Sequence, residues 1–486
     1  MIKNIKWLLL VSLITAACSS NEEEYTGIVP EKTPSAGTAD FSKYVALGDS
    51  FAAGFSDNAL FKAGQQNAYP NILAQQLALA GGGSFTTPFM VDNVGGFSMG
   101  GAQMAQFPTR LFFNGSAPVN VPGVSGTVYG DQLTGAFNNM GIPGAKSFHL
   151  TIPGYGSMNP YFGRFDSSAS ASVIGDAVAQ NPTFFSLWIG GNDVLSYASS
   201  GGAGRDQTGN MDPSTYGTND ITDPTVFGNV YSGLITALTA NGAKGVVANL
   251  PYINTLPYFT TVPYNPVPLD ANTAALLNSG YAQYNAGLQM AQGAGLLSAD
   301  EAASRKIQFE ASSNNKVVII DEYLTDLSGM GIPSYRQATK DDLLVLSART
   351  IIGTTVGGNP LLINGVSVPL ADNWVLTKNE IAEIRVATDA YNATIKGIAE
   401  EKGLAFVDTK AIMEQLVKGG IRYGNFHMTN SYVTGGVFSL DGVHPSARGY
   451  AMIADYFAKA IEVAYDASIP NVKVASFPMH YPMIMN

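Results

Sequence analysis

The chain has 486 residues, of which 46% are hydrophobic and only 13% are charged, a composition typical of a globular protein with a large buried core. Its formal net charge is −11 and it has no cluster of Lys and Arg. These features argue against nucleic acid as a partner, because binding to phosphates requires clustered cations.

The N-terminus resembles a secretory signal peptide, predicted to span residues 1–17. Lys3 precedes a short apolar run that is too short to cross a bilayer as a helix. Small residues then lead to Cys18, the only cysteine, in a pattern that resembles a bacterial lipobox with Thr15 in place of the usual Leu. The resemblance implies cleavage before Cys18 and lipid attachment to its thiol. The alternative is an ordinary signal peptide that happens to end near a cysteine.

Residues 18–40 are predicted to form a polar, flexible tether. Three glutamates at 22–24 follow the cysteine closely. They resemble the surface-export signal of Bacteroidetes lipoproteins, although a plain solvated tether explains them equally well. We therefore expect an exported outer-membrane lipoprotein, held at the membrane by its lipid and facing either the periplasm or the cell surface.

Residues 41–466 are predicted to form the folded domain. Apolar runs predict strands at residues 44–47, 183–189, 245–250, 316–321 and 404–408, and helical patterns occur at 69–80, 224–241, 377–402 and 446–465. Strands that are almost wholly apolar and separated by helices indicate a parallel sheet covered on both faces. The predicted fold class is therefore α/β, a three-layer α/β/α sandwich with a central, mostly parallel sheet.

Two long segments lack a clear period, and we interpret them as insertions at about 81–135 and 262–375. In the second, a hairpin is predicted within residues 360–375, turning at Asn364-Gly365. Residues 467–486 form a C-terminal tail.

Two apolar stretches lie in these irregular regions, the Phe-rich residues 107–113 and the Met-rich residues 479–485. Either stretch could line an acyl-binding site. Small satellite cores are the simpler explanation for both.

Ser50 follows Gly48 and Asp49 at the end of the first predicted strand. Ligands of parallel sheets bind beyond the carboxyl ends of the strands, so a hydroxyl here stands where chemistry is expected. Serine hydrolysis needs such a hydroxyl, a base to take its proton, and donors for the oxyanion. The tripeptide alone is weak evidence, because Gly-Asp-Ser also suits a turn or a helix cap.

The chain has four histidines, and His444 is the best candidate for the base. Asp441 precedes it by three residues, so the two side chains can meet across one turn. A carboxylate bonded to Nδ1 fixes the tautomer and leaves Nε2 free to accept the serine proton. The motif could equally be a loop entering a helix at Pro445. The remaining histidines, expected to be structural or on the surface, are His149, His427 and His480.

Two segments could supply the oxyanion donors. Asn192 follows a buried strand and can point its amide into the site, while the Gly-rich turn at residues 139–145 can bring the N–H of Gly144 close to a substrate. Each has a structural alternative, because Asn-Asp pairs and Gly-x-Pro-Gly sequences are common in ordinary loops.

Taken in order, these motifs resemble the four conserved blocks of the SGNH (GDSL) hydrolases. The matching blocks are Gly48-Asp49-Ser50 with Gly54, then Gly144, then Gly190-x-Asn192-Asp193, then Asp441-x-x-His444-Pro445. Phe51 replaces the usual Leu, a departure that we regard as harmless. Residues 93–96 (Asn-Val-Gly-Gly) are a rival for the second block, but the segment that holds Gly144 has the better spacing. The two insertions have no counterpart in this resemblance.

The resemblance implies a role for each matching residue. Ser50 is the nucleophile and gives a backbone N–H to the oxyanion, which also receives the N–H of Gly144 and the side-chain amide of Asn192. His444 acts as base and then as acid, and Asp441 orients it.

The resemblance also implies an esterase or lipase that cleaves a carboxylic ester through an acyl-serine intermediate. The expected substrate is an acylated carbohydrate, a lipid or a small ester. No cofactor is expected, and no metal either, since the histidines lack ligand spacing. The alternatives are an O-acyltransferase that acts on a glycan, and a non-catalytic surface lipoprotein that keeps the fold for binding.

Overall fold

A computed structural model describes residues 33–485 of the chain. The predicted signal peptide, the predicted lipidation site Cys18 and most of the tether lie outside the described residues. Within 33–485, no helix is both long enough and apolar enough to pass through a membrane.

Five parallel strands form the central sheet. They are β1 (Tyr44–Gly48), β6 (Asn139–Gly141), β7 (Phe184–Trp188), β8 (Lys244–Ala248) and β17 (Ala405–Val407). Their order across the sheet is β17-β8-β7-β1-β6, and all neighbouring pairs are parallel. Counted along the chain this is the order 2-1-3-4-5, which is flavodoxin-like. All residues of β1 and β7 are buried, as expected for strands covered on both faces.

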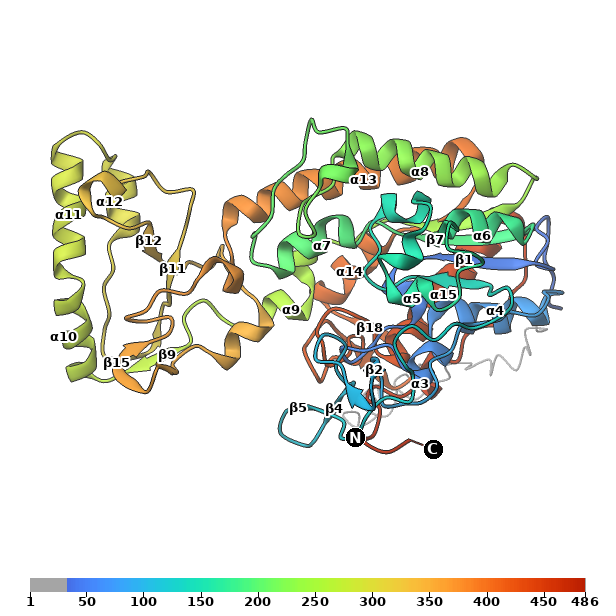
Figure 1. Cartoon of the computed structure of the whole chain (residues 1–486), viewed down its shortest axis with the longest axis horizontal. Helices are drawn as coiled ribbons and strands as arrows, with labels where there is room; N and C mark the ends of the chain where they lie inside the picture. The colour runs from blue at the N-terminus through green and yellow to red at the C-terminus, as the bar shows by residue number, and fades with distance from the viewer. Residues whose placement is uncertain (1–32, 486) are drawn as a thin grey trace, which may run out of the picture. The chain divides into compact units, whose positions relative to one another are not determined.

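Helices cover both faces of this sheet (Figure 1). On one face lie α4 (Tyr69–Leu79) and α15 (Ala447–Tyr465), which pack against each other. On the other face lie α6 (Val173–Ala179), α8 (Pro224–Thr239) and α13 (Lys378–Lys402). The predicted three-layer α/β/α sandwich is therefore confirmed.

The ends of the long helices follow from local capping. Before α13, Thr377 donates its N–H and hydroxyl to Glu380 Oε2, at 2.6 and 2.9 Å, and Gly403 ends the helix in the left-handed region with φ of 61°. Ser446 caps α15 by accepting the N–H of Gly449 at 3.0 Å. These caps match the predicted start and end of α13 and the predicted start of α15.

The strand order brings three strand ends together. β1 lies between β6 and β7. The connection from β1 to β6 and the one from β6 to β7 therefore run in opposite directions along the sheet, which makes this a topological switch point. A short helix, α2 (Ser50–Ala53), follows β1 and packs closely on β6. A Cβ atom on Gly141 would lie 2.2 Å from the backbone nitrogen of Ala53, so only glycine allows this approach.

The 81–135 segment has no helix after residue 80 and contains two short hairpins. They are formed by β2 (Ser98–Met99) with β3 (Ala102–Gln103), and by β4 (Leu111–Phe113) with β5 (Pro118–Asn120). Phe107 packs with Phe97 in one satellite cluster, and Tyr481 packs with Phe61 in another. Both apolar stretches singled out in the sequence thus have core partners.

The 262–375 segment is more ordered than the sequence suggested. It contains α10 (Ala271–Gly280), α11 (Ala282–Gly293) and α12 (Ala299–Arg305), and the pairs β9 (Val267–Leu269) with β10 (Ser312–Asn315) and β13 (Leu343–Leu344) with β16 (Val375–Leu376). The strand predicted at 316–321 exists as β11 (Val318–Ile320), but outside the central sheet. It pairs antiparallel with β12 (Tyr335–Gln337), the next strand along the chain.

The prediction of a hairpin that turns at Asn364-Gly365 is wrong. The structure has β14 (Thr355–Val356) paired with β15 (Asn359–Ile363), joined by Gly357 and Gly358. Both glycines have positive φ, 59° and 75°, which is what a tight two-residue hairpin turn requires.

Candidate active site

Ser50 lies at the carboxyl edge of the central sheet, directly after β1. It is the first residue of α2, and its side chain is buried. Asp49 holds the turn by accepting the N–H of Phe51 at 3.0 Å. The Ser50 hydroxyl therefore lies at the edge where ligands of parallel sheets bind.

The loop before α15 brings His444 to this hydroxyl. His444 Nε2 lies 2.8 Å from Ser50 Oγ, and His444 Nδ1 lies 3.0 Å from Asp441 Oδ2. With its proton on Nδ1, the imidazole donates to the carboxylate and accepts from the serine hydroxyl. This is the arrangement in which a histidine can act as the base.

Only 10% of the Asp441 side chain is exposed, and backbone N–H groups hold its carboxylate. Oδ1 accepts from Val443 and His444 at 2.9 and 2.8 Å, and Oδ2 accepts from Asn58 at 3.1 Å. Burial alone would raise the pKa of Asp441, but the charge of His444 and these hydrogen bonds outweigh it, so the pKa is lowered. The carboxylate therefore stays ionised beside the imidazole.

Residues shortly after Ser50 clamp the histidine loop. Ser56 donates its hydroxyl to the carbonyl of Pro445 at 3.1 Å. Asp57 accepts the N–H of Leu440 at 2.9 Å and donates its own N–H to Ser439 Oγ at 3.0 Å. This clamp cannot be predicted from the sequence, because a Ser-Asp-Asn turn gives no signal of a partner nearly 400 residues away.

Two aromatic rings enclose the imidazole of His444. The ring centroids of Phe51 and Phe55 lie 5.2 and 4.7 Å from that of the imidazole. On its other side, the Phe51 ring lies 4.9 Å from Trp188, at the end of β7. The residue that replaces the usual Leu of the family motif thus forms a wall of the site.

The loop after β6 lies beside the Ser50 turn, because Ile142 donates its N–H to the carbonyl of Gly48 at 3.0 Å. In this loop Gly144 has φ of 81°, and a Cβ atom there would meet nothing within 4 Å, so the backbone faces open space. Among the described residues, none accepts a hydrogen bond from the N–H of Gly144 or of Ser50. Both groups are free to bind an acceptor on a substrate.

Asn192 lies next to the same loop. It is the first residue of α7 (Asn192–Ser199), and its Nδ2 donates to the carbonyl of Ala145 at 3.0 Å. Among residues 33–485, no group accepts its second amide hydrogen, which is available to a ligand. The structure therefore brings Ser50, Gly144 and Asn192 to the ends of three adjacent strands.

Asp193 fixes the relation between α7 and the Gly144 loop. This fully buried carboxylate accepts the N–H and the hydroxyl of Ser147 at 2.8 and 2.7 Å. In the Asn-Asp pair, Asn192 therefore borders the site, while Asp193 anchors the loop that holds Gly144. No such role for Asp193 could be predicted from the sequence.

The rival segment at residues 93–96 lies elsewhere in the fold. Asn93 Oδ1 accepts the N–H of Ala63, and Gly96 donates its N–H to the carbonyl of Leu60. The other histidines also bond away from the triad. His149 pairs with Lys146, His427 with Gly419 and His480 with Val433.

Asp49, next to Ser50, is a buried carboxyl group, and burial raises its pKa from 3.8 to about 7. Because the folded-state pKa is higher than the unfolded value, the native state binds the proton more tightly. The stability this provides is present below about pH 4 and is lost as the pH rises through 7.

We therefore expect the unfolding free energy of the wild type to fall more between pH 5 and pH 8 than that of Asp49→Asn, by on the order of 3 kcal/mol. Urea denaturation at several pH values measures this difference. The exposed variant Asp341→Asn should follow the wild type. Equal slopes for Asp49→Asn and the wild type would show that Asp49 does not titrate in this window.

Carboxylates that could hold a cation gather at one place among residues 33–485. Oxygens of Glu322, Asp372 and Glu380 lie within 4.8 Å of one another. Asp372 Oδ1 and Glu380 Oε1 are buried without a hydrogen-bond partner among the described residues. This cluster contains no residue of the Ser50 site.

Searches against protein-family models and curated proteins found no match. Four chains among solved structures match. The acetylxylan esterase Axe2 from Geobacillus stearothermophilus aligns at 12% identity and a TM-score of 0.31, over 87% of this chain and 96% of that chain. A mutant of this acetyl-xylooligosaccharide esterase aligns at 12% identity and a TM-score of 0.32, with the same coverage.

Proposed function

We propose that this protein is a serine carboxylic ester hydrolase of the SGNH type that works through an acyl-Ser50 intermediate. The observation that carries the proposal is the 2.8 Å contact between Ser50 Oγ and His444 Nε2, with Asp441 bonded to the far side of the imidazole. A serine activated in this way attacks carbonyl carbon.

In the first half of the proposed reaction, Ser50 Oγ attacks the ester carbonyl and its proton passes to His444 Nε2. The N–H groups of Ser50 and Gly144 and the amide of Asn192 stabilise the oxyanion. When the tetrahedral intermediate collapses, the alcohol leaves with the proton from His444. The acyl group remains on Ser50.

In the second half, water attacks the acyl-enzyme. His444 Nε2 takes a proton from the water, a second oxyanion forms in the same place, and its collapse releases the carboxylic acid. Ser50 regains its proton from His444. Asp441 stabilises the imidazolium in both halves.

Hydrolysis of p-nitrophenyl acetate and butyrate tests the proposal. Acetylated xylan is included as a third substrate, because the aligned structures are named acetylxylan esterases. We expect turnover that Ser50→Ala abolishes. Adding a sugar acceptor then separates the two acyl-transfer hypotheses: free acid as the product indicates a hydrolase, whereas an acylated sugar indicates an O-acyltransferase. Unchanged hydrolysis of every ester by Ser50→Ala would refute the proposal.

Asn192→Ala should lower kcat about 10²- to 10³-fold with little change in KM, because the lost amide contacts the oxyanion rather than the ground-state ester. Steady-state kinetics with p-nitrophenyl butyrate measure the effect. Asn314→Ala, at an exposed position in β10, is the matched control. A change in KM alone would mean that Asn192 only binds substrate.

Export and lipid anchoring through Cys18 are part of the same proposal and are supported by the sequence of the N-terminus alone. Labelling of cells with an alkyne-bearing fatty acid should mark the wild-type protein and leave Cys18→Ala unmarked. Equal labelling of both would exclude Cys18 as the lipidated residue.

A further inference from the structure

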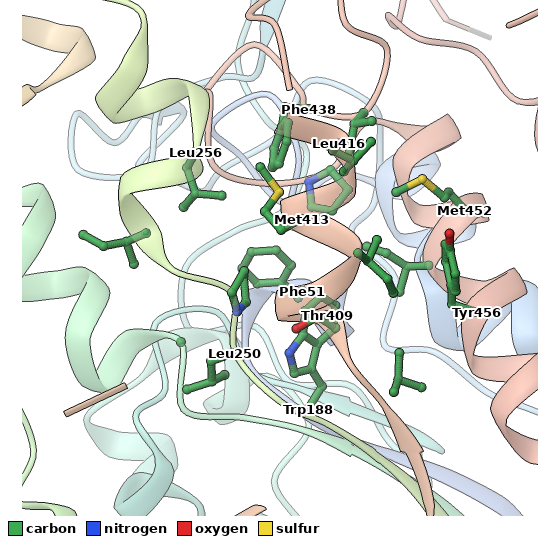
Figure 2. Close-up of a pocket in the computed structure, with 18 of the residues that line it drawn as sticks. Phe51, Trp188, Leu250, Leu256, Thr409, Met413, Leu416, Phe438, Met452 and Tyr456 are labelled. Atoms are coloured by element: carbon green, nitrogen blue, oxygen red, sulfur yellow. The ribbon is translucent and has the colours of Figure 1, made fainter. Parts of the chain in front are cut away.

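An apolar pocket opens at the edge of the sheet that holds Ser50. It lies beyond the ends of β7, β8 and β17 and is bordered by α14 (Thr409–Lys418) and α15. Its empty space is about 880 Å³, counting the mouth that opens to solvent. Figure 2 shows Met413, Leu416 and Met452 around this space, with Trp188 and Leu250 at its base.

The pocket shares its walls with the candidate active site. Asp49 and Phe51, on either side of Ser50 in the chain, line it, as do Gly191 just before Asn192 and Pro445 just after His444. The Phe51 ring reaches from the imidazole to Trp188, with centroids 5.2 and 4.9 Å away. The chain neighbours of Ser50, Asn192 and His444 therefore border this space.

The walls suit a hydrocarbon chain. Most lining residues are aliphatic, aromatic or methionine, and methionine adapts to chains of different shape. Two of the polar lining groups are already used, because Trp188 Nε1 and Thr409 Oγ1 both donate to the carbonyl of Asn249. A sugar placed here would lose its bonds to water and gain few in return.

We propose that this pocket binds the acyl chain of the substrate, so that the enzyme prefers linear acyl chains of medium length over acetyl. The inference rests on the proposed function and names the acyl half of its substrate. Burying each added methylene favours the bound chain by about fourfold until the pocket is full. The alcohol half is left on the solvent side.

The test is a series of p-nitrophenyl esters from acetate through butyrate and octanoate to palmitate. For the wild type we expect kcat/KM to rise at least about tenfold from acetate to octanoate. Met413→Trp, which fills the pocket, should lower octanoate turnover at least about tenfold while acetate turnover changes less than about twofold. Met413→Ala should move the optimum toward longer chains.

Val417→Trp is the matched control, because Val417 lies on the exposed face of the same helix, α14. It should keep the wild-type profile. An acetate optimum in the wild type, or identical profiles for the wild type and both Met413 variants, would overturn the acyl-pocket inference. Those outcomes do not contradict the proposed function if hydrolysis still depends on Ser50. The acyl-pocket inference and the proposed function are therefore tested by different results.

Discussion

Ser50→Ala and His444→Ala are each expected to lower kcat/KM for p-nitrophenyl butyrate by about 10⁴- to 10⁶-fold. In the proposed mechanism the two side chains act as one unit, because Ser50 Oγ gives its proton to His444 Nε2, which lies 2.8 Å away. The double variant should therefore be no slower than either single variant. Steady-state kinetics on all three proteins measure these effects.

A matched serine shows whether the loss comes from chemistry. Ser42→Ala changes an exposed serine just before β1 and should keep wild-type activity. The Ser50 and His444 variants should show the circular dichroism spectrum of the wild type. Losses that add up in the double variant would mean that the two residues act independently, contrary to the triad.

Asp441→Asn has the second effect that we expect to be large, a fall of about 10⁴-fold in kcat. An asparagine can still accept the N–H groups of Val443 and His444 with its oxygen. Its NH₂ then faces Nδ1, so the imidazole carries its proton on Nε2 and cannot accept one from Ser50. Kinetics at fixed pH measure the loss of kcat.

The exposed variant Asp300→Asn, in α12, serves as the comparison for Asp441→Asn and should be unaffected. A loss confined to KM in Asp441→Asn would argue that Asp441 shapes the substrate site instead of orienting the base.

The layered fold could be predicted because its elements carry local signals. The apolar runs at β1, β7, β8 and β17 stand between helices, and the caps at Thr377 and Ser446 mark helix ends. β6 was missed because it is only three residues long and runs into a Gly-Pro loop. The rule for parallel sheets then indicated the edge where Ser50 was expected.

Apart from the strand at 316–321, the order in the region 262–375 could not be predicted, because it depends on tertiary contacts. Arg336 is the clearest case. Buried next to β11, it pairs with Asp321 at 2.6 Å and with Asp342 at 2.7 Å. Such a pair stabilises a local arrangement only once the surrounding chain has folded. The residues of the region 262–375 therefore show no periodic pattern in the sequence.

For the site, the types of the candidate catalytic residues could be predicted from the sequence. The hydrogen bonds that hold these residues in place could not. A Ser, an Asp-x-x-His and an Asn-Asp are recognisable because the chemistry needs those groups. The Asp57 clamp and the hydrogen bond from Ser147 to Asp193 involve partners far apart in the chain. The same holds for the acyl pocket, whose walls come from β7, α14 and α15.

Reaction with a p-nitrophenyl phosphonate ester, followed by intact-mass measurement and peptide mapping, tests the central claim most directly. The account predicts a single phosphonyl adduct on the Ser50 hydroxyl, formed quickly in the wild type and hardly at all in His444→Ala. An adduct on a different residue, or an active esterase that stays unlabelled, would contradict it.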